Sequence, residues 1–557
     1  MRSGVVAAAS LAGGLVAACA WAQAPLPGTV QPGQIERQFQ KPPEPRAVPG
    51  GVQIPEVLQQ APANAESIRF VLNRVAVEGA TVYFAESLRG VYESFLGKEV
   101  TLGEIYRIAD ALTARYRNDG YILSQVIVPA QAVEGGAVRL QAIEGYVAEV
   151  RFEGGSEALQ ASAKDYADKI KAVRPLSAAV LERYLLLLND LPGVSARAVL
   201  APSKLQPGAS DLVLQLAQRR LAGGLGIDNR GSRSLGVNRL SGDVDAYYML
   251  ARGARTGLKF VTSGNRKLNF LSLSHDQLLG TEGGKLGVAV NVSRSEPETF
   301  AIIPLNLETE SETYTFAYSH PVIRSRSENL YVRGTLSAHD GRTDLFGVRD
   351  TEDHLRVLRL GLTYDRADSL AGVNLIDVEL SHGLRGLGAS RNGDPMLSRA
   401  NGRVDFSKIV LYAARVQPLG QSWSVFGALT TQHAFTNLLS SELFSYGGEQ
   451  FGRGHDPSEL VGDHGAAIKL ELRYTGALPA AAGSYTAYAF DDHAHVRQRE
   501  SAGLKAGESA ASAGLGVRFG IGSHVSGVIE AAKPVIRVVA QEGDQKTRVF
   551  GGLSVRF

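Results

Sequence analysis

From residue 219 to the C-terminus, apolar and polar residues alternate in short runs, which is the pattern of side chains along a β-strand. In residues 468–474 one face is apolar or aromatic, and Lys469, Glu471 and Arg473 lie on the other. Residues 358–365 alternate in the same way. We find about 16 such runs of about 9–12 residues, the length of a tilted strand that crosses an outer membrane. Their charged faces would meet water in a soluble sandwich and a wet lumen in a membrane barrel.

Residues 67–218 follow a different pattern, in which helical periodicity interrupts the strands. A capping box from Thr101 to Glu104 opens a helix whose apolar residues recur every three or four positions. The strands expected around this helix are residues 70–79, 122–128 and 137–143. The same order of elements then repeats, with helices expected at 158–173 and 177–191. The repeat predicts two α+β modules of about 75 residues, 67–146 and 147–218.

The first 66 residues show no such folded pattern. Residues 1–22 are typical of a secretion signal, with Arg2, an apolar stretch and the small-x-small cleavage site Ala20-Trp21-Ala22. Residues 16–19 leave open a lipoprotein site as the alternative. Residues 23–66 contain nine prolines, which favours a linker over a packed fold. One short helix is expected within this linker, over residues 34–40.

Composition restricts the classes of function. A net charge of +2 argues neither for a nucleic-acid partner nor for an acidic one. The chain has two tryptophans, so an aromatic belt at a membrane surface would consist of tyrosine and phenylalanine. The single cysteine, Cys19, lies in the leader, which removes disulfide and thiolate chemistry from the mature chain.

A glycine-rich stretch, residues 444–455, carries one arginine, Arg453, between Gly452 and Gly454. Glycine lets the backbone turn sharply and approach other backbone closely. Some distance further on, Phe490 and Asp492 lie in another alternating run. These two stretches together resemble the transporters of two-partner secretion, the family of haemolysin and filamentous-haemagglutinin exporters.

In that family a long extracellular loop folds back into the barrel, and the arginine of its Val-Arg-Gly-Tyr-like tip pairs with an aspartate on the barrel wall. The resemblance therefore implies that Arg453 pairs with Asp492, within an in-folded loop at about 433–465. Gly452 and Gly454 belong to the loop motif, in which His455 replaces the tyrosine. Phe490 belongs to the wall motif, whose last glycine is here Ala494.

Further motifs extend the resemblance over essentially the whole mature chain. They are Tyr116 with Gly120-Tyr121, residues 129–131, Glu144-Gly145, residues 188–193, 223–231 and 319–324, and the terminal Phe557. The resemblance implies two periplasmic α+β POTRA domains followed by a membrane β-barrel of 16 antiparallel strands over residues 219–557. Phe557 then resembles the signal read by the barrel-assembly machinery. The family often has an N-terminal plug helix, so the helix at 34–40 is either such a plug or part of a flexible spacer.

The function implied is export of one large partner protein, a β-helical adhesin or haemolysin, across the outer membrane of a Gram-negative bacterium. The POTRA domains would bind the unfolded cargo. The other expected partners are the barrel-assembly machinery, periplasmic chaperones and outer-membrane lipid. Two alternatives stay open: a barrel-assembly insertase of the same superfamily, which usually has more POTRA domains, and a passive porin, which has no use for residues 68–218.

We also searched the sequence for enzyme and metal chemistry. Residues 491–495 offer carboxylates and imidazoles, but residues 492, 493 and 495 cannot share one face of a strand. We therefore expect no metal site there. No nucleophile elbow or zinc-peptidase motif is present in the sequence, so we expect neither an enzyme nor a cofactor.

Overall fold

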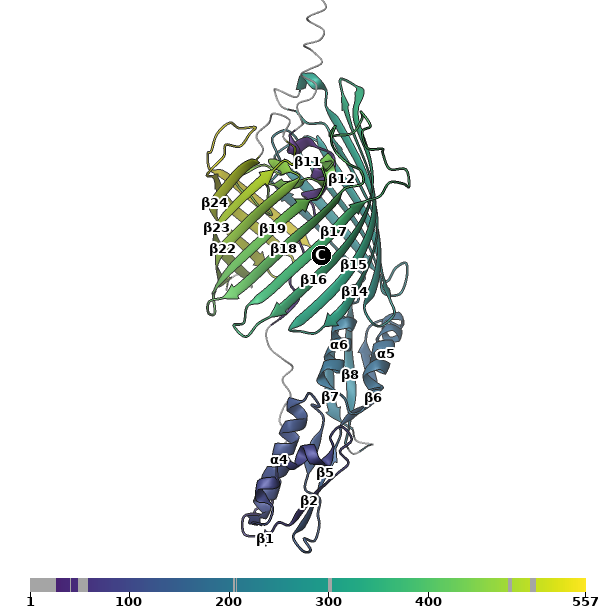
Figure 1. Cartoon of the computed structure of the whole chain (residues 1–557), viewed down its shortest axis with the longest axis vertical. Coiled ribbons are helices and arrows are strands. Elements are labelled where there is room, and N and C mark those ends of the chain that lie inside the picture. The colour runs from purple at the N-terminus through teal and green to yellow at the C-terminus, as the bar shows by residue number, and fades with distance from the viewer. Residues whose placement is uncertain are drawn as a thin grey trace, which may run out of the picture.

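The computed structural model describes residues 27–40, 42–48, 59–203, 206, 208–298, 303–478, 483–500 and 507–557. The expected leader, 1–22, and the parts of the expected linker at 23–26, 41 and 49–58 lie outside these residues. The described chain forms a barrel with two small α+β modules in line beneath it (Figure 1). Within this described part, no helix combines the length and the apolar character needed to cross a membrane.

Sixteen antiparallel strands close into one barrel, which confirms the predicted fold class. Each strand pairs with the next in chain order, and the last pairs with the first. The strands are β9 (Leu221–Asp228), β10 (Arg239–Tyr247), β11 (Ala254–Ser263), β12 (Leu268–Leu279), β13 (Gly284–Ser295), β14 (Glu308–Arg324), β15 (Glu328–Leu345), β16 (Val348–Ala367), β17 (Val373–Gly383), β18 (Ser407–Pro418), β19 (Trp423–Ala434), β22 (His464–Leu478), β23 (Gly483–Arg497), β24 (Gly507–Ile521), β25 (Val525–Pro534) and β26 (Arg548–Arg556).

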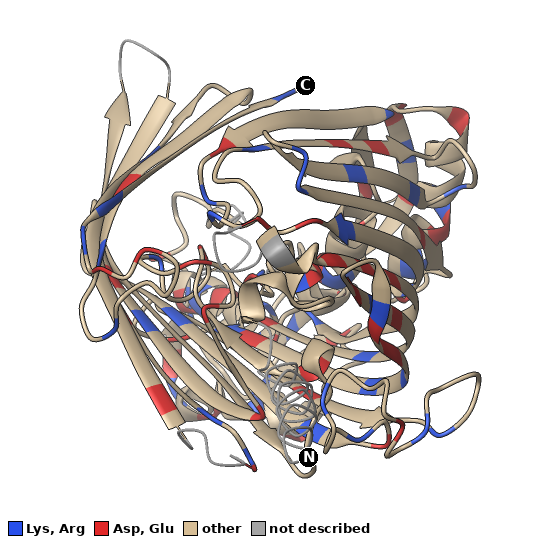
Figure 2. Cartoon of the chain, turned by 90° about the horizontal axis from the view of Figure 1, so that it is seen from above, with Lys and Arg blue, Asp and Glu red and all other residues tan. Residues whose placement is uncertain are grey.

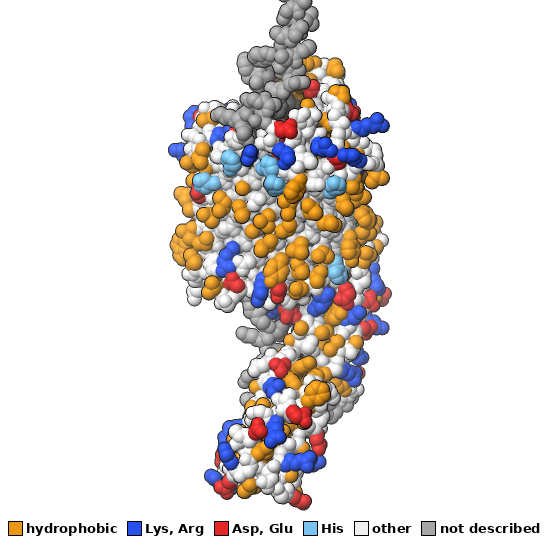
Figure 3. Space-filling model, in the orientation of Figure 1, with side chains coloured by type: hydrophobic (Ala, Val, Ile, Leu, Met, Phe, Trp, Pro, Cys, Tyr) orange, Lys and Arg blue, Asp and Glu red, His pale blue; other side chains and the backbone are white. Residues whose placement is uncertain are grey.

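The alternation along these strands sorts side chains between the outside of the barrel and its lumen. In β16, Leu358, Leu360 and Leu362 are exposed on the outer face, whereas Asp365 is buried on the inner one. Figure 3 shows the outward apolar side chains as a band across the visible face of the barrel, with charged groups near its two margins. An apolar band of this kind matches the hydrocarbon core of a bilayer.

The barrel closes between β9 and β26. Their register runs from Gly552 opposite Asp228 to Arg556 opposite Gly224. Phe557 extends this pairing, because its backbone N–H donates to the carbonyl of Gly223 at 3.0 Å and its carbonyl accepts from the Gly223 N–H at 3.2 Å. The Phe557 ring is exposed on the outside, and a Cβ at Gly223 would lie 2.7 Å from it. The role of Phe557 as an assembly signal stays a prediction.

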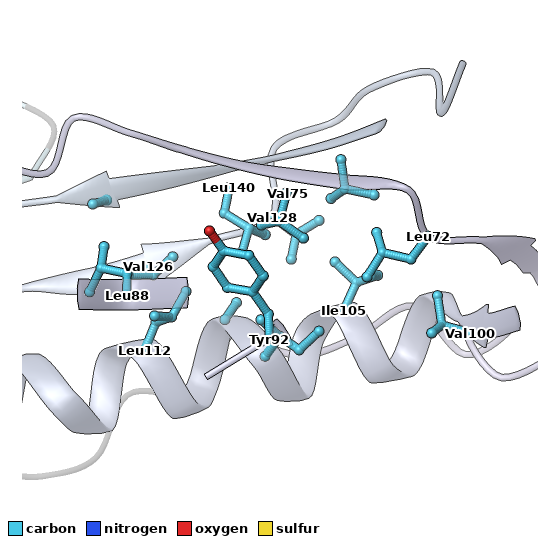
Figure 4. Packing of buried hydrophobic residues seen from close by; sticks show 14 of the residues in the cluster. Leu72, Val75, Leu88, Tyr92, Val100, Ile105, Leu112, Val126, Val128 and Leu140 are labelled. Carbon is cyan, nitrogen blue, oxygen red and sulfur yellow. The ribbon is translucent and has the colours of Figure 1, made fainter. Parts of the chain in front are cut away.

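The first module packs α4 against a three-stranded sheet in the order β2-β5-β4. Its elements are β1 (Arg69–Val71), β2 (Arg74–Glu78), α3 (Ala85–Arg89), η2 (Glu93–Phe95), β3 (Glu99–Thr101), α4 (Leu102–Asn118), β4 (Gln125–Ile127) and β5 (Ala137–Ile143). The capping box forms at the start of α4: the Thr101 hydroxyl accepts from the Glu104 N–H, and the Glu104 carboxylate accepts from the Thr101 N–H. Ile105 and Leu112 on α4 face Val75 and Leu140 on the sheet (Figure 4).

The single strand expected at residues 70–79 is wrong, because the chain forms two strands in two different sheets. β1 pairs with β3, whereas β2 pairs with β5. The change of partner falls at Leu72, whose N–H donates to Lys98, while the N–H of Asn73 donates to Gly136. Leu72 is fully buried, so packing of the core sets the break rather than strand propensity. The strand expected at 122–128 is likewise shortened to β4.

Glu144 joins one other motif residue of this module, Tyr116, to Thr81 and Val82. Its carboxylate accepts hydrogen bonds from the Thr81 N–H at 2.7 Å, the Thr81 hydroxyl, the Val82 N–H at 3.1 Å and the Tyr116 hydroxyl at 2.9 Å. Burial by itself raises the pKa of this carboxyl, but the hydrogen bonds outweigh it, and the net pKa is lowered. The next residue has no room for a side chain, since a Cβ at Gly145 would lie 2.3 Å from the Leu123 carbonyl oxygen.

Replacing Glu144 by glutamine should destabilise the first module by about 1 kcal/mol at neutral pH, because one of the two accepting oxygens becomes an NH2 group that cannot accept a hydrogen bond. A folded-state pKa that is lowered adds stability above the pKa of the unfolded carboxyl, and this stability is lost as the pH falls through the folded value. The difference between wild type and variant should therefore shrink in acid. Urea titration of the full chain in detergent, read by proteolysis of the module, measures this difference.

The control for this experiment is Glu134→Gln, which changes an exposed glutamate of the same module. We expect no change in stability for this control. Equal stability of the wild type and Glu144→Gln at neutral pH would contradict the assigned role of Glu144.

The second module packs two helices against the sheet β6-β8-β7 and stands directly against the barrel (Figure 1). Its elements are β6 (Tyr146–Gly154), α5 (Glu157–Lys171), α6 (Ala178–Asn189), β7 (Val194–Pro202) and β8 (Ala209–Gln218). Asp190 accepts two hydrogen bonds from Arg324 of β14, at 2.7 and 2.9 Å. Glu282, in the turn after β12, accepts from Arg183 and Tyr184. The runs 188–193 and 319–324, noted separately in the sequence, thus meet where the module docks.

Candidate functional site: the lumen of the barrel

The chain between β19 and β22, residues 435–463, lies inside the barrel, and we call it the inner loop. It contains η4 (Ser440–Glu442), β20 (Phe444–Tyr446) and β21 (Leu460–Gly462), and the two strands pair with each other. Viewed from above, chain segments with charged residues cross the interior (Figure 2). The inner loop occupies the place expected for the in-folded loop at about 433–465.

Arg453 and Asp492 are in direct contact, and both side chains are buried. Nη2 of Arg453 donates to Oδ1 of Asp492 at 2.6 Å, and Nε donates to Oδ2 at 2.9 Å. The backbone N–H groups of Gly452 and Arg453 donate to the same Oδ2 at 3.1 and 3.2 Å. A forked arginine–carboxylate pair with two further donors is a strong and geometrically specific contact. The geometry implied by the resemblance is present, and its role in export stays a prediction.

Phe490 and Gly452 shape the pocket around this pair. The Arg453 guanidinium lies over the Phe490 ring, 3.6 Å from its centroid, which adds a cation–π contact. Gly452 has φ +88°, and a Cβ there would lie 2.6 Å from the Tyr446 ring. Only glycine meets both requirements at this position.

Gly454 and His455 pack the other side of the loop tip against the barrel wall. A Cβ at Gly454 would lie 2.8 Å from the Ser512 side chain and 3.0 Å from the backbone nitrogen of Pro534. His455 is buried, with Nε2 3.3 Å from the carbonyl oxygen of Ala511. Both residues therefore hold the tip close to the wall strands β24 and β25.

Sequence reasoning missed two carboxylates that also surround Arg453. Nη1 of Arg453 contacts Glu471 of β22 and lies 3.8 Å from Glu530 of β25. Both carboxylates are buried. The charged face of residues 468–474 marks Glu471 as a residue of the lumen, although it does not name its partner. Glu530 carries no comparable signal in the sequence.

Other cations share these carboxylates with Arg453. Glu471 also accepts from Arg473 at 2.6 Å and from Arg518 at 3.0 Å. Glu530 accepts from Arg230, which follows β9, at 2.9 Å, and from the Tyr488 hydroxyl at 2.7 Å. The loop tip is thus one member of a charge network that joins β22, β23, β24, β25 and the chain after β9.

A second segment, residues 27–40, also lies in the lumen. It contains η1 (Gly28–Val30) and α2 (Gln34–Arg37), and Val30 and Ile35 are buried. The Gln34 amide donates to the carbonyl of Ser440 at 2.7 Å, and Glu36 accepts from the hydroxyls of Ser311 and Thr313. The expectation that the prolines prevent packing is therefore wrong for this part of the linker, because the wall and the inner loop supply polar partners. The helix also ends earlier than the expected 34–40.

Glu442 links this N-terminal segment to the inner loop and to the wall. Its carboxylate lies 3.4 Å from Arg37 of α2, 2.6 Å from Arg359 of β16 and 2.7 Å from Lys408 of β18. The Glu442 side chain is almost fully buried. One carboxylate thus contacts cations from three separate elements.

The residues weighed as metal ligands fall on opposite faces of β23. Asp492 points into the lumen, while Asp491 and His493 face outward and share a hydrogen bond at 2.7 Å. Among the described residues, no group of three or more His, Cys, Asp or Glu side chains is placed to hold a metal ion.

Comparison with known proteins places this architecture in a family. The model of the ShlB-type POTRA domain matches residues 70–145, and the model of the haemolysin secretion/activation protein ShlB/FhaC/HecB matches residues 289–519. The heme/hemopexin transporter protein HuxB of Haemophilus influenzae is 23% identical over 91% of this chain and 92% of its own length. The outer membrane transporter CdiB of Dickeya dadantii is 24% identical over 78% of this chain and 79% of its own.

Solved structures agree with these matches in fold. CdiB from Escherichia coli superposes with a TM-score of 0.73 at 20% identity, covering 90% of this chain and 93% of the other. Both POTRA modules, the closed 16-stranded barrel and the sequence matches along the chain point to the same assignment. The chain belongs to the haemolysin secretion/activation ShlB/FhaC/HecB family, the outer-membrane transporters of two-partner secretion.

Proposed function

We propose that this outer-membrane transporter exports one dedicated, large secreted partner from the periplasm to the cell surface. The observation that carries the proposal is the filling of the lumen: two segments, residues 27–40 and 435–463, occupy it through side-chain contacts. Segments held in this way are released without breaking the strand pairing of the barrel. A passive pore has no need for such segments.

The POTRA domains bind the unfolded cargo in this proposal. β7 lies at one edge of the second sheet and pairs only with β8, so one row of its backbone donors and acceptors faces outward. An extended segment adds to such an edge through backbone hydrogen bonds, with little demand on its sequence. The cargo is then a long chain that folds outside the cell, such as a β-helical adhesin or haemolysin.

During biogenesis, the proposed partners are periplasmic chaperones and the barrel-assembly machinery, which would read the outward-facing Phe557 at the closing strand. The proposal assigns no catalytic residue and no cofactor to the chain.

The test compares surface and culture-supernatant proteins of the native host with and without this gene. Loss of one large protein, restored by the wild-type gene, supports the proposal and names the cargo. Loss of many outer-membrane barrels would instead indicate an insertase, and an unchanged protein profile would favour a porin. Either of these two results rejects the proposal.

A further inference from the structure

Five histidines on β17, β19, β22 and β23 lie on the outer face of the barrel near its extracellular end, where His354 of β16 also faces outward but bonds to Asp340 at 2.8 Å. They are His382 of β17, His433 of β19, His464 of β22, and His493 and His495 of β23, and we call them the histidine arc. On each strand they share the face of exposed apolar residues such as Leu380, Leu429 and Ile468. Histidine side chains gather at the upper margin of the apolar band on this face (Figure 3).

Strand register makes the histidine arc continuous. His382 bonds to Ser407 at 2.9 Å on the neighbouring strand. The rings of His433 and His464 are 4.7 Å apart, and His464 lies opposite Arg497. The last member along the barrel, His495, bonds to Ser509 of β24 at 2.9 Å. The histidine arc therefore extends from β17 to β23, and its hydrogen bonds reach Ser407 on β18 and Ser509 on β24.

The acidic groups around the histidine arc are engaged with other partners. They are Asp491 with His493, Asp405 with Arg385 and Arg403, Asp463 with Arg399, Glu508 with Arg537, and Glu500 with Asn401. Arg497 is exposed and has no carboxylate partner among the described residues. At the extracellular ends of β12 to β14, by contrast, Lys267 pairs with Glu296 and Glu298, and Arg294 pairs with Glu308 and Glu310. Beside the histidine arc, Arg497 is thus a basic group without a matching acid.

We propose that the histidine arc, together with Arg497, binds the phosphate groups of outer-leaflet lipid. The margin of the apolar band is the depth at which lipid head groups contact a membrane protein. Imidazolium and guanidinium groups donate hydrogen bonds to phosphate, and guanidinium does so with a matching fork. The adjacent Ser407 and Ser509 hydroxyls fix two of the rings.

The experiment measures binding of lipid A to the full chain in phosphatidylcholine nanodiscs by native mass spectrometry. The variant combines His433→Gln, His464→Gln, His495→Gln and Arg497→Gln, and heat-modifiable gel migration verifies that its barrel is folded. Because each basic group near an anionic surface contributes about fivefold, we expect the variant to bind lipid A at least about tenfold more weakly.

The matched control is His524→Gln, which removes an exposed histidine in the turn after β24, at the opposite end of the barrel. This control should bind lipid A like the wild type. Equal affinity of the wild type and the quadruple variant for lipid A overturns the proposal. So does equal binding of lipid A from which the phosphates have been removed, because that result would assign the affinity to the acyl chains.

Discussion

Replacing Arg453 by alanine is expected to reduce export of the partner protein at least about tenfold while the barrel stays inserted. The change leaves Asp492 without its forked partner and removes one cation from Glu471 and Glu530. Removing one member of a buried ion pair costs about 3–5 kcal/mol, which shifts the docking equilibrium of the loop tip by more than about 100-fold. Immunoblotting of the cargo in the culture supernatant, with heat-modifiable migration of the transporter, measures both parts of the prediction.

Three further variants separate the role of Arg453 from general damage to the barrel. Arg453→Lys keeps the charge but loses the fork to Asp492, so export should fall to an intermediate level. The double variant Arg453→Ala with Asp492→Ala removes both buried charges and should regain stability without regaining export. Arg385→Ala changes an exposed arginine outside the lumen and should export normally. Normal export by both Arg453→Ala and Asp492→Ala would rule out a role for the pair.

The barrel was the most predictable part of the fold, because alternation is a local signal. Once one face of a strand must meet lipid, the register of apolar side chains assigns every other residue to the lumen. Residues 468–474 illustrate this: Leu470 is exposed to the outside, and Glu471, one residue away, is buried in the charge network. The motif resemblance then added one long-range pair, Arg453 with Asp492, which alternation alone does not provide.

The contents of the lumen were predictable only in part. Glu36 meets Ser311 and Thr313, and Gln34 meets Ser440, across hundreds of residues of chain. Nothing local in residues 23–66 indicates such partners, and a proline-rich segment has the composition of an exposed linker. Long-range polar contacts of this kind depend on the closed barrel, so the sequence pattern of one segment does not contain them. The break of the expected strand at Leu72 has a similar origin, since two sheets compete for adjacent residues.

The second large effect is expected at Glu442, where the N-terminal segment, the inner loop and the wall meet. Arg37, Arg359 and Lys408 all lie within 3.4 Å of its carboxylate. Gln34 and Arg37 also donate to backbone carbonyls of the inner loop at Ser440 and Leu443. α2 and the base of the inner loop are therefore held by the same contacts. Loss of the carboxylate leaves three cations close together without their shared anion, a costly arrangement in a buried site.

Replacing Glu442 by glutamine should therefore open the pore by releasing α2, with a several-fold rise in mean conductance across a planar bilayer, since removing one member of a buried ion pair costs about 3–5 kcal/mol. Arg37→Gln removes only the ion pair between Arg37 and Glu442. It should give a smaller rise in conductance, because Glu442 keeps its contacts with Arg359 and Lys408. The matched control is Glu36→Gln on the same helix: its partners are neutral hydroxyls, so its conductance should stay close to that of the wild type. A Glu442→Gln channel as closed as the wild type would mean that contacts elsewhere hold α2 in the lumen. A large opening by Glu36→Gln would contradict the assignment of the closing contact to Glu442.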